Sequence, residues 1–456
     1  MVPKLRLISG CNLSTLAVAL LGTALFCLAA QPSQPYGIAK RTSSKPFLSM
    51  PERADGVIPP LLSQTGAFTD TPNLVPAPGL IPYDLVVPFW SDGAGKERWM
   101  AAPDGGKIKF SATGEWGFPK GTVFVKHFEL PIDERTPQVQ RRLETRLLVC
   151  DSAGGVYGVS YKWRADNSDA ELLTSNLFEK IAIQTASGTR AQTWYYPSRQ
   201  DCLTCHTKGA GGVLGPKARQ LNHPFTYPSG VTDSELRAWN HAGLFEPDLD
   251  ERNLGTIPTL ARLDDTTRPL EERARSYLDA NCSSCHRPGG TVANFDARYD
   301  VPLAKQRLIE GEVLINEGLD HAHPVAPRDI WRSIVFLRIN TLEGMKMPPL
   351  AHQELDHTGI GLMRQWIESL PGKPVLPPPI ISQHGGNYAQ PVEVALAESE
   401  PGSRIHYTLD GSAPDKEDPV YERPIRLTTP TVLRARAFKD GFTRSITSQE
   451  VFVIGE

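Results

Sequence analysis

The chain has 456 residues, of which 40% are hydrophobic and 22% charged, and its formal net charge at pH 7 is -3. This composition is that of ordinary globular protein, the length is enough for about three domains, and the charge gives no sign of a nucleic-acid partner. The abundance of proline (40) and glycine (38) favours turns and β-structure.

Residues 1–30 have the pattern of a secretory signal peptide. Lys4 and Arg6 precede the apolar run LAVALLGTALFCLAA, which ends in small residues. The run is nearly long enough to cross a membrane, so an uncleaved anchor stays open as an alternative. In both cases we expect a periplasmic, secreted or cell-envelope protein, with no membrane span once the signal is cleaved.

Residues 31–55 are expected to be a linker, and residues 56–200 a β-rich domain. In the second range, stretches such as GTVFVKHFEL and RRLETRLLVC alternate in polarity and are separated by turn residues. This pattern predicts an antiparallel β-sandwich or barrel. Glu144 and Arg146 are expected to pair on the surface of a strand, and Cys150 to be a buried free thiol.

Two copies of the pattern CxxCH follow, CLTCH at 202–206 and CSSCH at 282–286. Two thiols one turn apart can both add to the vinyl groups of a haem, while the adjacent imidazole binds the iron. A disulfide pair or a shared zinc site would not need a histidine directly after each cysteine pair. We therefore expect two covalently bound haem c groups.

Residues 201–258 are expected to form a small first haem c segment, poor in helix. Cys202 and Cys205 would carry the thioether bonds, and His206 would be the proximal iron ligand. The distal ligand stays open, and without one the iron would be accessible to substrates. The candidates are His223, His241, His127 and Met100.

The second motif lies in a more helical context. RPLEERARSYLDANCSSCH predicts a helix that opens at Pro269 and ends at the motif. LDHTGIGLMRQWIESLPG predicts another helix, with Asp356 as its cap and Pro371 and Gly372 as its stop.

With the methionine-proline pair of EGMKMPPL, residues 259–372 resemble class I cytochromes c, in which a first helix runs into CxxCH and a final helix crosses it. The resemblance implies that Cys282 and Cys285 hold the second haem, that His286 is the proximal ligand and that Met347 is the distal one.

The distal ligand of this second haem has competitors. Met345 lies close to Met347, and His321 and His323 leave a haem with two histidine ligands open. A thioether ligand from Met347 favours Fe(II). The second haem would then have the higher potential, and electrons would pass to it from the first.

After a proline-rich linker at 373–377, residues 378–456 read as alternating strands joined by turns. They resemble the chitobiase/β-hexosaminidase C-terminal domain, an immunoglobulin-like β-sandwich, most specifically in YTLDGSAP. The resemblance implies an accessory role, with carbohydrate as an open partner. Asp410 and Gly411 are read as a turn and not as catalytic residues.

Stretches such as PFWSDGAGKERW, YPSRQDCLTCH and GVLGPKARQLN also resemble a group of secreted bacterial dihaem proteins. This wider resemblance supports the domain order and the haem count but implies no reaction.

The expected fold class is multidomain and mixed. It has an N-terminal β-sandwich or barrel, a central α-helical cytochrome c-like haem region and a C-terminal immunoglobulin-like β-sandwich.

The expected function is that of an exported dihaem c-type cytochrome that transfers electrons to a periplasmic redox partner protein, and no catalytic residue is assigned. One alternative is a dihaem oxidoreductase whose open first haem acts on peroxide or a small molecule. The other is an envelope polysaccharide-binding protein that carries a haem relay.

Overall fold

The computed structural model describes residues 35–40, 44–290, 295–398 and 400–455. The chain divides into two units, Met1–Pro35 and Tyr36–Glu456, and the helices and strands of the described residues belong to the second. The predicted signal peptide at 1–30 therefore lies outside the described residues. Within the described part of the chain, no helix has the length and apolar character that crossing a membrane requires.

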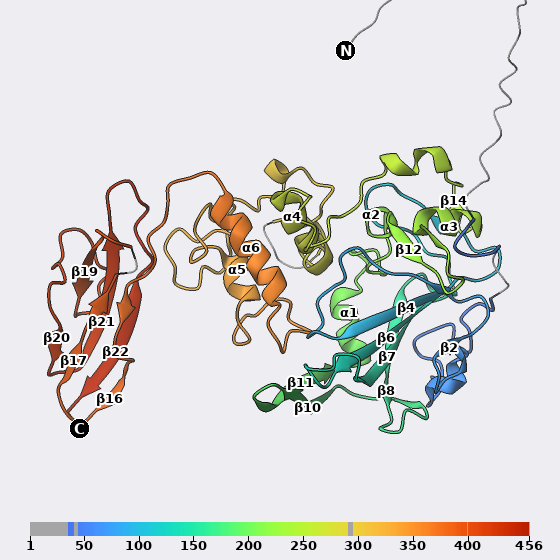
Figure 1. Ribbon diagram of the computed structural model, residues 1–456, viewed down its shortest axis with the longest axis horizontal. Helices are drawn as coiled ribbons and strands as arrows, with labels where there is room; N and C mark the ends of the chain where they lie inside the picture. The colour runs from blue at the N-terminus through green and yellow to red at the C-terminus, as the bar shows by residue number, and fades with distance from the viewer. Residues whose placement is uncertain (1–34, 41–43, 291–294, 399, 456) are drawn as a thin grey trace, which may run out of the picture. The chain divides into compact units, whose positions relative to one another are not determined.

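A six-stranded antiparallel sheet is the main element of the N-terminal region (Figure 1). Its strand order is β3-β4-β6-β7-β8-β9, so β3 and β9 are its edges and the sheet is open. A hairpin of β10 and β11 packs on β6 and β7 through a separate apolar cluster. The strands of this region are β1 (Phe68–Asp70), β2 (Val75–Pro76), β3 (Ile81–Pro82), β4 (Gly95–Ala101), β5 (Ile108–Lys109), β6 (Val123–Pro131), β7 (Gln140–Cys150), β8 (Val156–Trp163), β9 (Ala170–Leu172), β10 (Leu177–Thr185) and β11 (Gly188–Tyr196).

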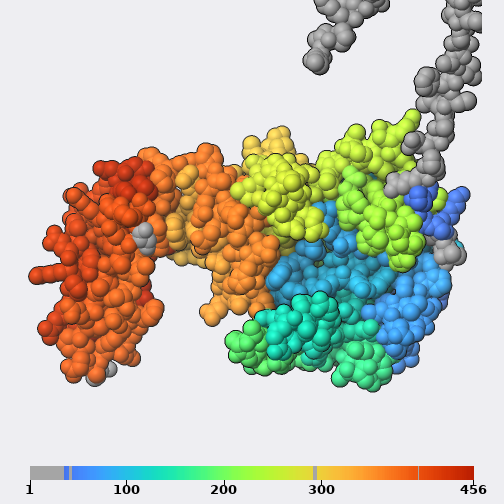
Figure 2. Space-filling view, in the orientation of Figure 1, coloured from blue at the N-terminus to red at the C-terminus, as the bar shows by residue number. Residues whose placement is uncertain are grey.

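The sheet contributes to two cores, because successive side chains along a strand point to opposite faces. One face, with Trp99 and Leu147, packs on N-terminal loops that include Leu48 and Met50 from the predicted linker. The other face, with Phe124, packs against the helices that follow the first motif. Figure 2 shows one face of the molecular surface in the same orientation.

The sheet is followed by short helices and strands. The first motif lies in a segment with α1 (Arg199–Cys205), α2 (Ala218–Leu221), β12 (Pro224–Thr226), β13 (Thr232–Ser234), α3 (Glu235–His241), β14 (Phe245–Glu246) and a 3-10 helix (Glu251–Thr256). The second motif lies in a segment with α4 (Leu270–Asn281), a 3-10 helix (Leu303–Lys305), α5 (Ile334–Ile339) and α6 (His357–Ser369). A further 3-10 helix near the start of the chain spans Leu62–Thr65.

The prediction of a central α-helical cytochrome c-like region is wrong. The protein is mostly β, with 29% strand and 15% helix, and the helices of residues 259–372 are 12, 6 and 13 residues long, joined by long loops. Helix periodicity did identify α4 and α6, which pack together, and Asp356 caps α6 by accepting from the amide of Gly359 at 2.9 Å. The segments between them carry many glycines and prolines, which favour loops.

The expectation of a surface pair on β7 is also wrong. Glu144 is fully buried, because the β10–β11 hairpin covers this face, and its carboxylate accepts from Arg146 at 2.6 Å and from the indole of Trp194 at 3.1 Å. Alternation along the strand does not show which face another hairpin will cover. Cys150 is a buried free thiol, as expected.

The C-terminal region is a β-domain, as expected. One sheet has the order β16-β22-β21-β19, β17 pairs with β20, and β15 with β18. Its core includes Leu433 and Phe452, and Gly411 has a φ of 82°, which suits the predicted Asp-Gly turn. The strands are β15 (Ile380–Ile381), β16 (Gly386–Tyr388), β17 (Val392–Val394), β18 (Leu396–Ala397), β19 (Arg404–Thr408), β20 (Ile425–Leu427), β21 (Thr431–Phe438) and β22 (Ser448–Ile454).

Asp92 joins the loop before β4 to the loop before α6. Its Oδ1 accepts from the backbone amides of Gln353 at 2.7 Å and Glu354 at 3.0 Å, while its Oδ2 is buried without a partner among the described residues. Burial raises the pKa of Asp92 to about 6. The folded protein therefore holds this proton more tightly than the unfolded chain does.

We predict that Asp92→Asn removes part of the pH dependence of stability. In the unmodified protein the contribution of Asp92 is complete below its ordinary pKa of 3.8 and is lost as the pH rises through about 6, a loss of about 3 kcal/mol for a shift of this size. Asparagine keeps the Oδ1 acceptor and tolerates the left-handed backbone at this position (φ 49°).

Urea unfolding between pH 4 and pH 7 tests this prediction. As the pH rises from 4 to 7, the free energy of unfolding of the unmodified protein should fall more than that of Asp92→Asn. The exposed Asp248→Asn provides the control. Parallel curves for Asp92→Asn and the unmodified protein would contradict the assignment.

Candidate functional site

The first CxxCH motif begins inside a capped helix. Ser198 caps α1 by accepting from the amide of Asp201 at 3.2 Å, and the Asp201 carboxylate accepts from the amide of Ser198 at 2.8 Å. Cys202 and Cys205 lie in this single helix, and His206 closes it by donating its amide to the carbonyl of Cys202 at 3.0 Å. Local helix geometry therefore sets the spacing of the two thiols and the imidazole.

The sheet leaves room for this motif at Gly158 of β8. A Cβ atom built on Gly158 would lie 2.7 Å from the Sγ of Cys202 and 3.8 Å from the side chain of Leu148. A larger side chain would displace the thiol. Gly158 thus allows α1 to approach the sheet closely.

His206 is held in one tautomer. Its Nδ1 lies 2.8 Å from the carbonyl oxygen of Gly212, which can only accept, so Nδ1 carries the proton and Nε2 keeps its lone pair. Burial lowers the pKa of His206 to about 4, with smaller contributions from the cations of Lys126 and Arg146. The imidazole is therefore neutral at physiological pH, and its fixed Nδ1 proton is the arrangement that metal-binding histidines use.

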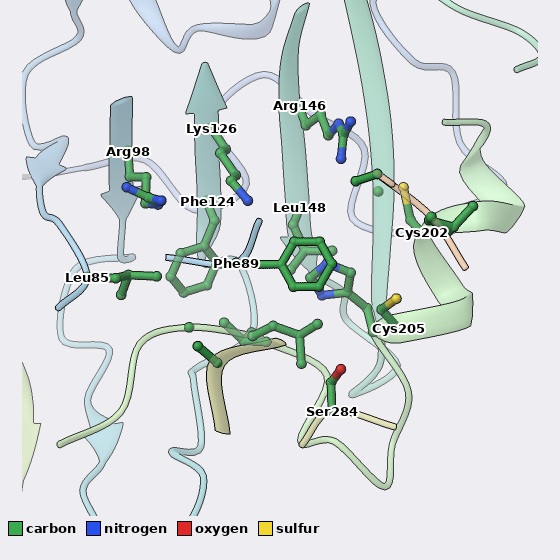
Figure 3. Close-up of a pocket in the computed structure, with 18 of the residues that line it drawn as sticks. Leu85, Phe89, Arg98, Phe124, Lys126, Arg146, Leu148, Cys202, Cys205 and Ser284 are labelled. Atoms are coloured by element: carbon green, nitrogen blue, oxygen red, sulfur yellow. The ribbon is translucent and has the colours of Figure 1, made fainter. Parts of the chain in front are cut away.

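A cavity of ≈ 200 Å³ lies beside the first motif (Figure 3). Cys202, Cys205 and His206 line it, together with apolar side chains of the sheet and of the loop before β4. The second motif also reaches it. Its contribution comes from Ser283, Ser284 and Arg287.

The two motifs are in contact. Cys205 and Cys285 form a hydrogen bond between their sulfur atoms, which lowers the pKa of Cys285 to about 6 and raises that of Cys205. The loops after the motifs also touch, since a Cβ atom on Gly209 would lie 2.5 Å from the carbonyl oxygen of Gly289. Residues 80 positions apart in the chain are thereby neighbours.

Ion pairs hold this contact in place. Lys217, next to α2, donates to Asp279 of α4 at 2.7 Å, and both side chains are buried. Arg287, directly after the second motif, donates to Glu115 of the N-terminal region at 2.8 Å.

The second motif packs into the core of its own segment. Cys282 ends α4 and packs against the core of its segment, and burial raises its pKa to about 12. The ring of His286 stacks on Phe295 with 4.4 Å between centroids, and its Nδ1 is buried with no partner among the described residues.

Arg338 lies near His286 and near Met347, the residue expected to be the distal ligand. Burial and the charge of Arg338 lower the pKa of His286 to about 4. The backbone amide of Met347 donates to the carbonyl of Arg338 at 2.9 Å, and the guanidinium of Arg338 lies 3.8 Å from the Sδ of Met345. Both methionines are thus close to Arg338. Met347 is half-buried and Met345 is exposed.

None of the four candidates for the first distal ligand lines the cavity, and each has other contacts. His127 bonds Thr145 and Glu129, His223 pairs with Glu235, His241 stacks on Tyr36, and Met100 is buried in the core. Of the two further candidates in the second segment, His323 is bonded to the carbonyl of Gly311 and His321 is exposed.

Sequence reasoning missed two side chains. Lys126 of β6 lines the cavity, and His352 is buried beside the backbone of Met347 with neither ring nitrogen in a well-formed hydrogen bond. Alternation along β6 places Lys126 on the same face as Phe124, so this pattern could have identified Lys126 as a residue of the site. No local pattern identifies His352.

The expectation of a metal-binding group among the side chains is wrong. In the described part of the chain, no cluster of three or more His, Cys, Asp or Glu side chains could hold a metal ion. His206, His286 and Met347 are each isolated donors. At the first motif, the neutral imidazole, the two thiols and the adjoining cavity fit a metal ion held in a porphyrin ring, because the ring supplies the other ligands.

Comparison with known families supports one of the resemblances. Residues 383–449 match the chitobiase/beta-hexosaminidase C-terminal domain, so the C-terminal domain is of a carbohydrate-related type. The match does not extend to either CxxCH motif. No curated protein matches the chain.

Proposed function

We propose that the protein is an exported dihaem c-type cytochrome that transfers electrons in the periplasm or cell envelope. Bound haem c supplies reversible one-electron chemistry at its iron. The chain contributes two thiol pairs, each followed by a buried histidine with a pKa of about 4. A neutral imidazole is the form that binds a metal.

The observation that carries the proposal is the contact between Cys205 and Cys285. One cysteine from each CxxCH motif takes part, so the two attachment points are adjacent. Two separate disulfide pairs would not need to meet, and the described residues contain no cluster of three or more His, Cys, Asp or Glu side chains that could hold a shared metal ion. Two one-electron carriers attached there would be close neighbours, as transfer between them requires.

A second function is favoured by the cavity itself. Apart from His206, no histidine or methionine among the described residues lines it. An iron held by His206 would then have an open position, which suits an oxidoreductase acting on peroxide or a small molecule. Coordination at the first motif distinguishes the two functions.

The C-terminal domain has the contacts of a packing module. Arg332 donates to the carbonyls of Arg444 at 3.2 Å and Ser445 at 3.0 Å, and Arg444 pairs with Asp320 at 3.0 Å. Residues 378–456 contain no tryptophan, and their partly buried tyrosines pack on the core of the domain. These features favour a role in packing against the preceding segment over sugar binding on a flat aromatic surface.

The haem count tests the proposed function directly. The protein purified after export should have the mass of the chain plus two haems, and Cys202→Ala combined with Cys205→Ala should remove one of them. Cys150→Ala is the matched control, because Cys150 is a buried free thiol outside both motifs, and it should leave the count at two. A colourless protein with the mass of the bare chain would refute the proposal.

The motif contact makes a separate prediction for protein produced without haem. Mild treatment with diamide should join Cys205 to Cys285, the two thiols passing two electrons and two protons to the oxidant. Cys202→Ala should still form this disulfide, since the Cys202 thiol faces the carbonyl of Ser198 at 3.4 Å. Peptide mapping without reduction identifies the product. A disulfide between Cys202 and Cys205 alone would contradict the contact.

Electron paramagnetic resonance of the oxidised protein separates the electron carrier from the oxidoreductase. An open position at the first motif predicts a high-spin signal that is absent from His206→Ala. The His223→Ala variant should retain this signal, because His223 does not line the cavity. Two low-spin signals would instead support a pure electron carrier.

A further inference from the structure

Three basic residues form a row across the sheet beneath the cavity. In the antiparallel register, Arg98 of β4 is opposite Lys126 of β6, and Lys126 is opposite Arg146 of β7. All three line the cavity. Like charges directly opposite one another destabilise a sheet, so this row needs a source of negative charge.

The protein supplies that charge at two of the three positions. Arg98 pairs with Asp84 at 2.7 Å, and Arg146 pairs with Glu144 at 2.6 Å. Among the described residues, Lys126 has no carboxylate partner. The amine of Lys126 lies over the ring face of Phe128, 5.0 Å from the ring centroid.

The surroundings of Lys126 disfavour an isolated charge. Burial lowers the pKa of its amine well below the ordinary value, and the neighbouring cations Arg98, Lys96 and Arg146 lower it further. Lys96, which shares this face of β4, donates to the carbonyl of Phe89 at 2.8 Å and supplies no negative charge. The amine of Lys126 is half-buried, lies between two guanidinium groups and faces the cavity, which makes this a favourable position for an anion.

The neighbouring row on the same face is apolar. Phe124 is opposite Leu148, and Leu148 is opposite Gly158, over which the thiol of Cys202 lies. Figure 3 shows the side chains of Lys126 and Arg146 on adjacent strands, with Cys202 and Cys205 on the neighbouring helix. The cavity floor therefore has an apolar row with a cationic row beside it, one step along the strands, and the cation of Arg146 also acts on both thiols.

We propose that Arg98, Lys126 and Arg146 form a carboxylate-binding site for the propionate groups of the haem attached at Cys202 and Cys205. This inference rests on the proposed function. A haem is apolar on the vinyl edge that joins the cysteines and anionic on its propionate edge, which matches the two rows of the floor. Lys126 supplies a positive charge that forms no ion pair with a carboxylate of the described residues, although the charge of Glu144 acts on it from a distance.

The test compares Lys126→Met, Lys126→Arg and the exposed strand control Lys180→Met in the full protein that carries both haems. Loss of a positive charge disfavours the reduced iron. In Lys126→Met the reduction equilibrium constant of one haem should fall roughly tenfold, about 59 mV for a one-electron couple. Lys126→Arg should retain the original potential, and Lys180→Met should change neither haem.

Stability in the absence of the first haem provides a second readout. In the Cys202→Ala, Cys205→Ala chain, Lys126→Met should raise the free energy of unfolding, because an unpaired buried amine is removed. In the protein with both haems the same substitution should not raise it, because the amine has its carboxylate partner.

The outcomes distinguish the sources of the carboxylate and the two proposals. If added succinate shifts a potential in the unmodified protein but not in Lys126→Met, the site takes a soluble carboxylate and the propionate assignment is overturned. A changed spin state in Lys126→Met would show that the amine binds iron, which also overturns it. Two haems with potentials unchanged by Lys126→Met would refute this inference alone, whereas absence of haem would refute the proposed function.

Discussion

The antiparallel register of β4, β6, β7 and β8 is the constraint on which the site depends. It places Phe124, Leu148 and Gly158 in one row and Arg98, Lys126 and Arg146 in the next. A slip of one residue on any of these strands would turn its members to the opposite face, which packs on the N-terminal loops. The floor of the cavity is therefore set by strand pairing, and α1 places the thiol of Cys202 over Gly158.

A second constraint holds the two motifs together. Lys217 and Asp279 form a buried ion pair between α2 and α4, and Arg287 pairs with Glu115. Removing one member of a buried pair typically costs 3–5 kcal/mol, because the other charge stays buried without a partner. Such pairs favour one relative placement of the segments that carry the motifs, which is what the contact of Cys205 with Cys285 requires.

Burial has opposite consequences for the groups around the cavity. It keeps His206 neutral and thus ready to bind a metal, and Gly212 fixes its tautomer. For Lys126, burial removes hydration, and no carboxylate of the described residues forms an ion pair with its amine. The same apolar surroundings therefore keep His206 in the form that binds a metal and make an anion beside Lys126 favourable.

The sequence by itself determined the features set within a few residues of the chain. The thiol spacing, the caps of α1 and α6, the helices α4 and α6 and the C-terminal strands all follow from local helix and turn geometry. Only the tertiary structure decided that Glu144 is buried, that the proposed distal ligands of the first motif face elsewhere, and that Lys126 lies between two arginines under the cavity. These features depend on strand register and on contacts between segments far apart in the chain, and neither has a local signal. Local patterning also misjudged the loops between α4 and α6, because a helix at each end of a segment does not make the residues between them helical.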